Sequence, residues 1–303
     1  MAFQKVTREK SKLRLALAGP SGAGKTLSAL LLAYGITNDW SKIALIDTEH
    51  GRAKFYANRS DFGTGEFLYQ EMSAPYSPNK YIAMVKEGAE AVGEDGVVIV
   101  DSFSHAWNNS GGVLEIKEKI EGGNNKKSFS AWAEAGKIQN NLVNSVLSTN
   151  CHTIVTMRTK MAYAIEQNEN GKNVPVKLGL EPVQRENTEY EFDIVLNIAR
   201  NHIASASKDT TFLDSWSGII TSELGKSLKE WLDDGVEPEV CEDCKKKILP
   251  TRTKTIQEIV EGSVKTYGKK MCWACVMNEF KRRKELADSG TEDVSGSVGE
   301  KGT

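Results

Sequence analysis

Several kinds of segment are missing from this sequence of 303 residues. No apolar run approaches the ~20 residues that a membrane-spanning helix needs, so we expect no membrane contact. The first residues, MAFQKVTREKSK, are polar and charged and contain no apolar export signal, which predicts a cytoplasmic location. Cysteines number only 5, and in a reducing compartment so small a set does not indicate a disulfide framework.

Positive and negative charges nearly cancel over the whole chain, but they are unevenly distributed along the sequence. Lys and Arg total 39 and Asp and Glu 41, which gives a net charge of −2. The segment 241–284 carries 12 basic against 5 acidic residues, residues 285–303 carry 1 against 5, and residues 1–240 carry the remaining −5. A polyanion bound through bulk charge would therefore favour 241–284, although such a basic run is equally typical of a solvated face.

A glycine-rich interruption stands out in the run LRLALAGPSGAGKTLSALLLAYG, residues 13–35. The pattern predicts a buried strand up to Ala18 and a helix from Thr26 to Tyr34. Between them the spacing Gly19-x4-Gly24-Lys25-Thr26 matches a phosphate-binding loop, in which the lysine reaches the β- and γ-phosphates and the threonine hydroxyl binds Mg²⁺. The predicted ATP-binding residues are Gly19, Pro20, Ser21, Gly22, Ala23, Gly24, Lys25 and Thr26. The alternative, a glycine-rich turn before a chance lysine, fits the strand and helix less well.

A second apolar strand, VVIVD over residues 97–101, ends in Asp101. In phosphate-loop proteins a carboxylate at the end of such a strand supports the Mg²⁺ beside the loop. An apolar strand that ends in aspartate is common by itself. The role of Asp101 is therefore assigned because the same sequence also contains the phosphate loop. We therefore expect Thr26 and Asp101 to serve as the Mg²⁺ ligands.

These strands belong to a longer alternation of β-rich and helical stretches. Further apolar, β-rich runs occupy residues 42–47, 67–71, 152–157 and 191–199, and helices are expected from Ser77-Pro78 and over 130–147. We therefore predict an α/β fold with a mostly parallel sheet and helices on both faces. The polar stretch 166–173 predicts a hairpin tip at Asn170-Gly171, and glycine-rich borders predict a mobile segment over 110–128.

Four of the cysteines form two CxxC pairs, Cys241-x2-Cys244 and Cys272-x2-Cys275. Four thiolates can close a tetrahedral Zn²⁺ site, and a complete thiolate shell indicates a structural rather than a catalytic metal. Redox chemistry is the lesser interpretation, because no thioredoxin-like context surrounds either pair. Cys151 precedes an apolar strand and is expected to be buried.

Composition divides the chain into three parts. Residues 1–235 hold the phosphate-loop domain, and a polar linker, DDGVEPEV, ends it. Residues 236–284 hold the cysteine pairs and are predicted to form a small zinc-binding module. Residues 285–303 are mostly Ser, Gly, Thr and acids, so we expect a disordered acidic tail.

Several motifs resemble one family. IDTEH after the second strand and VDS after the fourth are similar to the core of RecA-type ATPases. LIDTEHGRAKFYA, VDSFSHAW, LGLEPVQRENTEYEFDIVLNI and ASKDT, with a zinc-ribbon-like C-terminal module, resemble the bacteriophage AAA-type, RecA-like P-loop ATPases associated with single-strand annealing and recombination. The match covers about residues 10–232.

This resemblance implies a function and a set of partners. It implies a RecA-like core that hydrolyses ATP while acting on single-stranded DNA in phage recombination or annealing, in the host cytoplasm. It also implies a homo-oligomer and a single-strand binding protein as a further partner.

The same resemblance implies roles for individual residues. Glu49 takes the position of the glutamate that activates the attacking water, with Asp47 as its rival and a surface or capping glutamate as the alternative. Arg158 or Lys160 would sense the γ-phosphate, and Lys208 would reach the ATP of a neighbouring subunit. Each of these cations could equally be an ordinary surface charge. His105, Trp107 and Trp132 could stack on bases, or pack in the core.

Two other functions share the same loop. A small-molecule phosphotransferase would have a similar fold, but such kinases usually carry paired arginines in a lid, and residues 110–128 contain lysines and no arginine. A nucleotide-switched binding module would bind ATP with little hydrolysis. The rate of ATP hydrolysis with and without single-stranded DNA separates these functions.

Overall fold

The structure is a computed structural model that describes residues 5–122, 128–167 and 173–289. Within these residues the chain forms two compact units, which divide at Asp233 and Asp234. Residues 11–233 make the larger unit, and residues 5–10 join residues from 234 onward in the smaller one. None of the described helices combines the length and the apolar character that crossing a bilayer requires.

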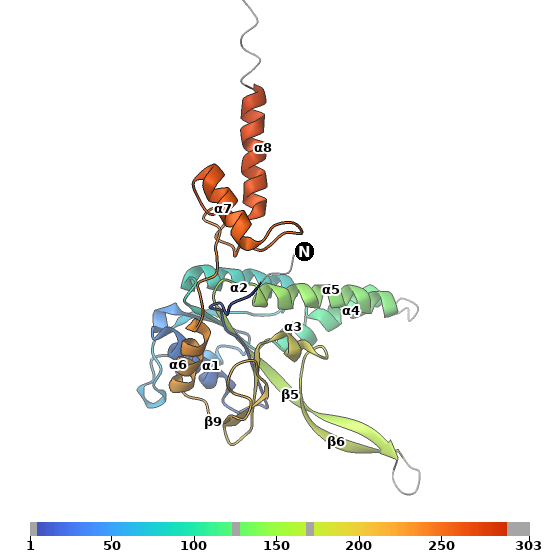
Figure 1. Ribbon diagram of the computed structural model, residues 1–303. Coiled ribbons are helices and arrows are strands. Elements are labelled where there is room, and N and C mark those ends of the chain that lie inside the picture. The colour runs from blue at the N-terminus through green and yellow to red at the C-terminus, as the bar shows by residue number, and fades with distance from the viewer. Residues whose placement is uncertain (1–4, 123–127, 168–172, 290–303) are drawn as a thin grey trace, which may run out of the picture. The chain divides into compact units, whose positions relative to one another are not determined.

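The larger unit is built on one mixed sheet (Figure 1). The strand order is β3-β2-β4-β5-β1-β7-β8-β9, with β6 paired to β5. The strands are β1 Arg14–Gly19, β2 Ile43–Asp47, β3 Leu68–Glu71, β4 Val97–Asp101, β5 His152–Gln167, β6 Asn173–Pro182, β7 Ile194–Ile198, β8 Ile203–Lys208 and β9 Ser217–Ile219.

Most strand pairs are parallel, as the sequence predicts. Strands β3, β2, β4, β5, β1 and β7 pair in parallel, whereas β6, β8 and β9 are antiparallel additions. In the parallel register Gly19 lies opposite Arg158, and Asp47 lies opposite Asp101. The chain segments that follow β1, β2 and β4 therefore emerge at the same edge of the sheet, beside Arg158 in the middle of β5.

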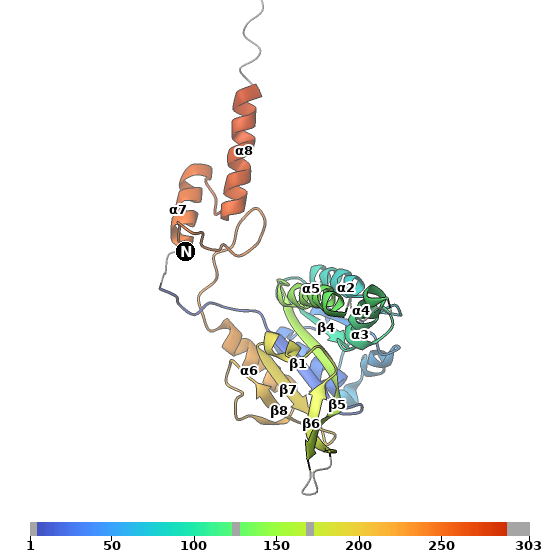
Figure 2. The same ribbon diagram turned by 90° about the vertical axis from the view of Figure 1, so that its right-hand side faces the viewer.

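Helices cover both faces of the sheet, because each buried strand alternates its side chains between them. The helices of this unit are α1 Lys25–Thr37, α2 Pro78–Val92, α3 His105–Asn108, α4 Val113–Glu121, α5 Ser128–Leu147 and α6 Ser222–Asp233. Leu15 and Leu17 pack in the core with α1 and α6, whereas Ala16 and Ala18 pack in the core with α2 and α5. Figure 2 shows α2 to α5 grouped on one side of the sheet and α6 on the other.

The contact between α1 and α6 depends on a glycine. A Cβ atom added to Gly35 would lie 2.0 Å from the carbonyl oxygen of Ser222, which begins α6. No larger residue fits at this crossing, so the sequence permits the helices to pack backbone against backbone.

Strand β5 is much longer than the expected strand at 152–157. Beyond the sheet it pairs with β6 alone, from Thr159 opposite Pro182 to Gln167 opposite Asn173, and forms the ribbon that projects in Figure 1. The antiparallel pairing agrees with the predicted hairpin, although its tip at Asn170-Gly171 lies outside the described residues. The segment 110–128, expected to be mobile, contains helix α4, which the sequence analysis did not predict.

The smaller unit is organised around the cysteines. Helix α7, Ile256–Tyr267, begins with a capping box in which Thr255 and Glu258 bond to each other's backbone N–H. Helix α8 covers Trp273–Ser289, so residues 285–289, which the sequence analysis places in a disordered tail, are helical. The rest of that tail lies outside the described residues. The core of this unit consists of Cys241, Ile248, Ile259 and Met271.

A buried histidine links β5 to the strand that carries the phosphate loop. His152 Nδ1 accepts a hydrogen bond of 2.9 Å from the backbone N–H of Leu13, and its Nε2 has no partner among the described residues. Burial, reinforced by nearby cations of which Lys12 is the first, lowers the pKa of His152 to about 3. The folded protein therefore keeps this ring neutral at pH values where an exposed histidine is protonated.

We predict that His152 makes the larger unit acid-sensitive. The unfolded chain binds a proton near pH 6.5 and the folded chain only near pH 3, so stability is full above pH 6.5 and falls with acidification between these values. The expected slope approaches about 1.4 kcal/mol per pH unit. Urea unfolding between pH 7.5 and 5 should show a shallower loss for His152→Gln, whose amide oxygen still accepts from Leu13. Identical slopes for both proteins would contradict this assignment.

Candidate nucleotide and metal sites

The glycine-rich segment forms a tight loop between β1 and α1. Gly24 adopts φ 90°, a left-handed conformation that favours glycine, and α1 begins at the next residue. The N-terminal N–H groups of α1 therefore start at the loop, an arrangement that favours anions. His202, in the turn between β7 and β8, lies against this loop with Nδ1 3.1 Å from the carbonyl oxygen of Ala23.

Lys25 folds back onto the loop that precedes it. Its Nζ donates to the carbonyl oxygens of Gly19 at 2.9 Å and Pro20 at 3.0 Å. Burial lowers the pKa of Lys25, against the opposing charge of Asp101. The ammonium group is thus held in the loop at the place where phosphate oxygens would compete with the two carbonyl groups.

Asp101 lies at the buried end of β4, directly beside Thr26. Thr26 Oγ1 donates to one carboxylate oxygen at 2.5 Å, and Thr156 Oγ1 donates to the other at 2.5 Å. Burial raises the pKa of Asp101. A hydroxyl and a carboxylate oxygen in contact are the kind of hard ligands that Mg²⁺ prefers, so the residues present fit the predicted metal pair.

Two acidic residues at the end of β2 have different surroundings. Asp47 is fully buried, and its carboxylate accepts from the backbone N–H of Glu49 at 2.5 Å and of Ala53 at 3.0 Å. The hydroxyl of Tyr69 also donates to it at 3.2 Å. These bonds hold the loop 48–53 in place, so Asp47 acts on the loop conformation rather than on a ligand.

Glu49 points toward the loop and is held by arginine. Its Oε1 accepts from Arg158 Nη2 at 2.7 Å and Nε at 2.8 Å, and Arg52 Nη1 lies 3.4 Å from Oε2. The Glu49 side chain is 14% exposed, whereas that of Arg158 is 44% exposed. Lys160 instead pairs with Glu181 at 3.1 Å on the β5–β6 ribbon. Of the two predicted γ-phosphate sensors, the structure brings only Arg158 to the loop.

These groups line one cavity of about 310 Å³. Three of its residues, Arg52, Phe55 and Tyr56, are not among those predicted from the sequence, although they belong to the motif that contains Glu49. Their position in the sequence could have identified them, because the segment that follows β2 must begin at the edge of the sheet where the phosphate loop lies. The cavity residues are Ser21, Gly22, Gly24, Lys25, Thr26, Glu49, Arg52, Phe55, Tyr56, Asp101 and Arg158.

Lys208 lies away from its own phosphate loop. It ends β8 opposite Val195, at the start of β7, and its Nζ donates to the carbonyl oxygen of Tyr190. Strand β7 is parallel to β1, so Lys208 is at the edge of the sheet opposite the loop. It therefore takes no part in the cavity of its own chain.

The three candidate stacking residues separate into two groups. His105 is buried, with Nδ1 2.7 Å from Thr48 Oγ1, and its pKa is lowered by burial and then by Arg158. It is a core residue and does not offer a ring face to a base. Trp107 and Trp132 stack on each other with ring centroids 6.4 Å apart, and both line a second cavity of about 650 Å³.

Comparison with known families decides the class of the nucleotide site. A family model described as an AAA domain matches residues 11–217. The chain belongs to this AAA-domain family. It is therefore an AAA-domain P-loop ATPase, which confirms the predicted α/β phosphate-loop core. Comparison with curated proteins gave no match.

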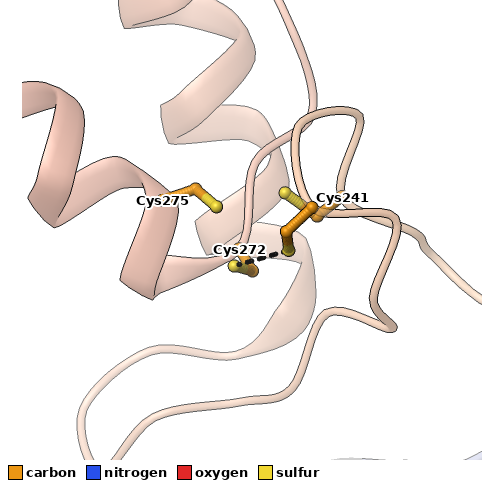
Figure 3. Close-up of side chains that lie close together, drawn as sticks. Cys241, Cys272 and Cys275 are labelled. Carbon is orange, nitrogen blue, oxygen red and sulfur yellow. Dashed lines mark hydrogen bonds between the residues drawn. The ribbon is translucent and has the colours of Figure 1, made fainter.

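The four paired cysteines lie outside the matched AAA domain and form a cluster of their own. Their sulfur atoms all lie within 4.8 Å of one another, and Cys244 and Cys272 Sγ are 3.7 Å apart. Figure 3 shows Cys241, Cys272 and Cys275 turned toward one another. Four Zn–S bonds of about 2.3 Å in a tetrahedron would place the sulfurs about 3.8 Å apart, so the cluster is consistent with Zn²⁺. Cys151, in the other unit, is buried as predicted.

Two substitutions should separate nucleotide binding from hydrolysis. Lys25→Ala should lose ATP affinity because it removes the cation from the loop, whereas Glu49→Gln should bind ATP and hydrolyse it roughly 10²- to 10⁴-fold more slowly. Titration with a fluorescent ATP analogue and a phosphate-release assay measure the two effects. Glu71→Gln is the matched control, because this carboxylate ends the neighbouring β3 and pairs with Lys54 outside the cavity. Near-normal turnover by Glu49→Gln would remove the role of base from Glu49.

Proposed function

We propose that this AAA-domain ATPase hydrolyses ATP with Glu49 as the general base and Arg158 as the γ-phosphate sensor. The observation that supports it most directly is the Glu49–Arg158 ion pair beside the loop that holds Lys25. Bound in the cavity, a γ-phosphate would compete with Glu49 for the arginine. Its arrival would turn Arg158 away and free the carboxylate.

The freed carboxylate then has a chemical task. Glu49 accepts a proton from a water molecule whose oxygen attacks the γ-phosphorus, while the bond to the β–γ bridging oxygen breaks and ADP leaves. Lys25 and Arg158 offset the charge that develops on the phosphate oxygens. Thr26 and Asp101 would hold Mg²⁺, which adds further positive charge there.

We further propose that this ATPase acts on single-stranded DNA, in recombination or annealing of the phage type. The motifs that resemble that group support the idea, and so does the aromatic pair. Trp132 is 46% exposed, Lys117 Nζ lies 5.1 Å from its ring centroid, and the adjoining cavity includes Lys160 and Arg185. Exposed aromatic faces with nearby cations are the usual platform for unpaired bases.

A short path connects the aromatic pair to the ATP site. Trp107 lies in α3, six residues after Asp101, and Ser104, just before α3, accepts a hydrogen bond of 2.9 Å from the backbone N–H of Arg158. A strand of DNA that shifts α3 would therefore move a contact of the γ-phosphate sensor. This coupling is the physical reason to expect hydrolysis that depends on DNA.

Assembly completes the proposal. Lys208 lies at the edge of the sheet opposite its own loop, where it can meet a second subunit rather than its own ATP. We propose that in a homo-oligomer on DNA it reaches the phosphates of a neighbour and offsets transition-state charge there. A single-strand binding protein is a further proposed partner, because it would occupy the same DNA.

Single-stranded DNA should stimulate ATP hydrolysis, and duplex DNA of the same length should not. Trp132→Ala should raise the DNA concentration needed for half-maximal stimulation roughly 5-fold or more, since one stacked base contributes about 1–3 kcal/mol. Phe129→Ala is the matched control, because Phe129 is exposed on the same helix outside the cavity. A rate of ATP hydrolysis that is the same with and without DNA would contradict the DNA role. Transfer of phosphate from ATP to a small molecule would instead favour a phosphotransferase.

We also propose that Cys241, Cys244, Cys272 and Cys275 hold one structural Zn²⁺. Because the module is small, it has little apolar core of its own, and removal of the metal should unfold it. ATP hydrolysis by the larger unit should remain intact. Metal analysis of freshly reduced protein should give one zinc per chain. Cys272→Ser should lose the metal, whereas Cys151→Ser, in the larger unit, should keep it. A zinc-free wild-type protein with a folded module would contradict the assignment.

A further inference from the structure

The cysteine module carries an open apolar groove between α7 and α8. The groove has a volume of about 340 Å³, and its apolar walls are formed by Ile259, Tyr267, Trp273, Val276, Met277 and Phe280. Gly262 lies in its lining, and a Cβ atom added there would meet nothing within 4 Å. The size is at the lower end of the range for pockets that hold a ligand, about 300–1,000 Å³.

Part of this apolar surface is exposed in the described chain. Phe280 is 56% exposed, and Trp273 and Met277 are each 37% exposed. Their spacing of four and three residues puts them in one row along α8. A contiguous apolar row on so small a unit is typical of a surface that binds another chain.

Cations surround this row. Lys254 Nζ lies 4.6 Å from the centre of the Trp273 ring, and Arg283 Cζ lies 4.7 Å from the centre of the Tyr267 ring. Lys284 is exposed and follows Met277 by seven residues, on the same face of α8. Of the described residues that line the groove, Glu258 is the one acid, and Thr255 already donates to its carboxylate from both N–H and Oγ1.

We propose that this groove binds a short acidic segment of another protein, which inserts large apolar side chains between α7 and α8. Its carboxylates would pair with Lys254 and Lys284 around the rim and would compete for Arg283 with Glu279, whose Oε1 lies 3.0 Å from Arg283 Nε. The segment 241–284 has seven more basic than acidic residues, so its charge complements such a partner even with four thiolates bound to Zn²⁺. The amphipathic groove and its aromatic anchors correspond to a common way of recognising peptides.

Two other occupants fit the groove less well. Residues 290–303 of this chain are acidic, but their largest apolar residues are Val294 and Val298, which offer little to fill it. Single-stranded nucleic acid could pair with the cations and stack bases on Trp273 and Phe280, but it would leave the aliphatic part of the walls, Ile259, Val276 and Met277, without a matching surface. An acidic peptide with large apolar side chains satisfies both the walls and the rim.

The test is a selection from a display library of random twelve-residue peptides on the full-length, zinc-loaded protein. Enriched peptides should combine several acids with at least one aromatic or large aliphatic residue. In fluorescence anisotropy they should bind Phe280→Glu and Lys284→Glu roughly 5- to 30-fold more weakly, the equivalent of about 1–2 kcal/mol. Leu249→Glu and Lys246→Glu are matched controls, because both residues are exposed in the same unit outside the groove.

Several results would overturn the proposal. They are selected peptides that are not acidic, peptides that bind Phe280→Glu as tightly as the wild type, and displacement of the peptides by single-stranded DNA. Light scattering that shows an oligomer dissociated by Phe280→Glu would assign the groove to a second copy of the chain. Tighter peptide binding after removal of residues 290–303 would assign it to the chain's own tail. Zinc content confirms that each variant is folded, and the assay contains no nucleotide, so its failure leaves the ATPase proposal untouched.

Discussion

A carboxylate buried at the end of β4 determines the arrangement of the nucleotide site. Burying a charge is costly unless it is hydrogen-bonded, and Asp101 receives one hydroxyl from α1 and another from β5, each at 2.5 Å. These two bonds join the phosphate-loop helix, β4 and β5 at one edge of the sheet. The parallel strand order brings β2 to the same edge, and with it Glu49. An AAA-domain ATPase thus gathers its charged groups where the ends of β1, β2 and β4 lie beside the middle of β5.

Burial also distinguishes acids that look alike in sequence. Asp47 and Glu49 are two residues apart, yet Asp47 is enclosed by two backbone N–H groups and a tyrosine hydroxyl. Glu49 has arginine partners instead, and a phosphate can compete for those. Both side chains are carboxylates, so their hydrogen-bond partners make the difference. Asp47 supports the loop, whereas Glu49 can exchange its arginine partners and remains able to react.

The sequence predicts the parts of this site that depend on local pattern. The phosphate loop, Asp101 and the cysteine pairs are set by spacing within a few residues, and the structure places their members together. The γ-phosphate sensor could not be chosen between Arg158 and Lys160 without knowing the length of β5. Because β5 continues past the sheet, Lys160 lies on the β5–β6 ribbon, where it pairs with Glu181. The burial of His105 and the pairing of Trp107 with Trp132 depend on contacts between distant elements, which no local pattern reveals.

The central claim is that ATP takes Arg158 away from Glu49. A structure of the protein with Mg²⁺ and a non-hydrolysable ATP analogue tests it most directly. We predict phosphate oxygens at the Lys25 ammonium group, the metal ion at Thr26, and the Arg158 guanidinium on the γ-phosphate with Glu49 released. A γ-phosphate bound in the loop while the Glu49–Arg158 pair stays intact would contradict it.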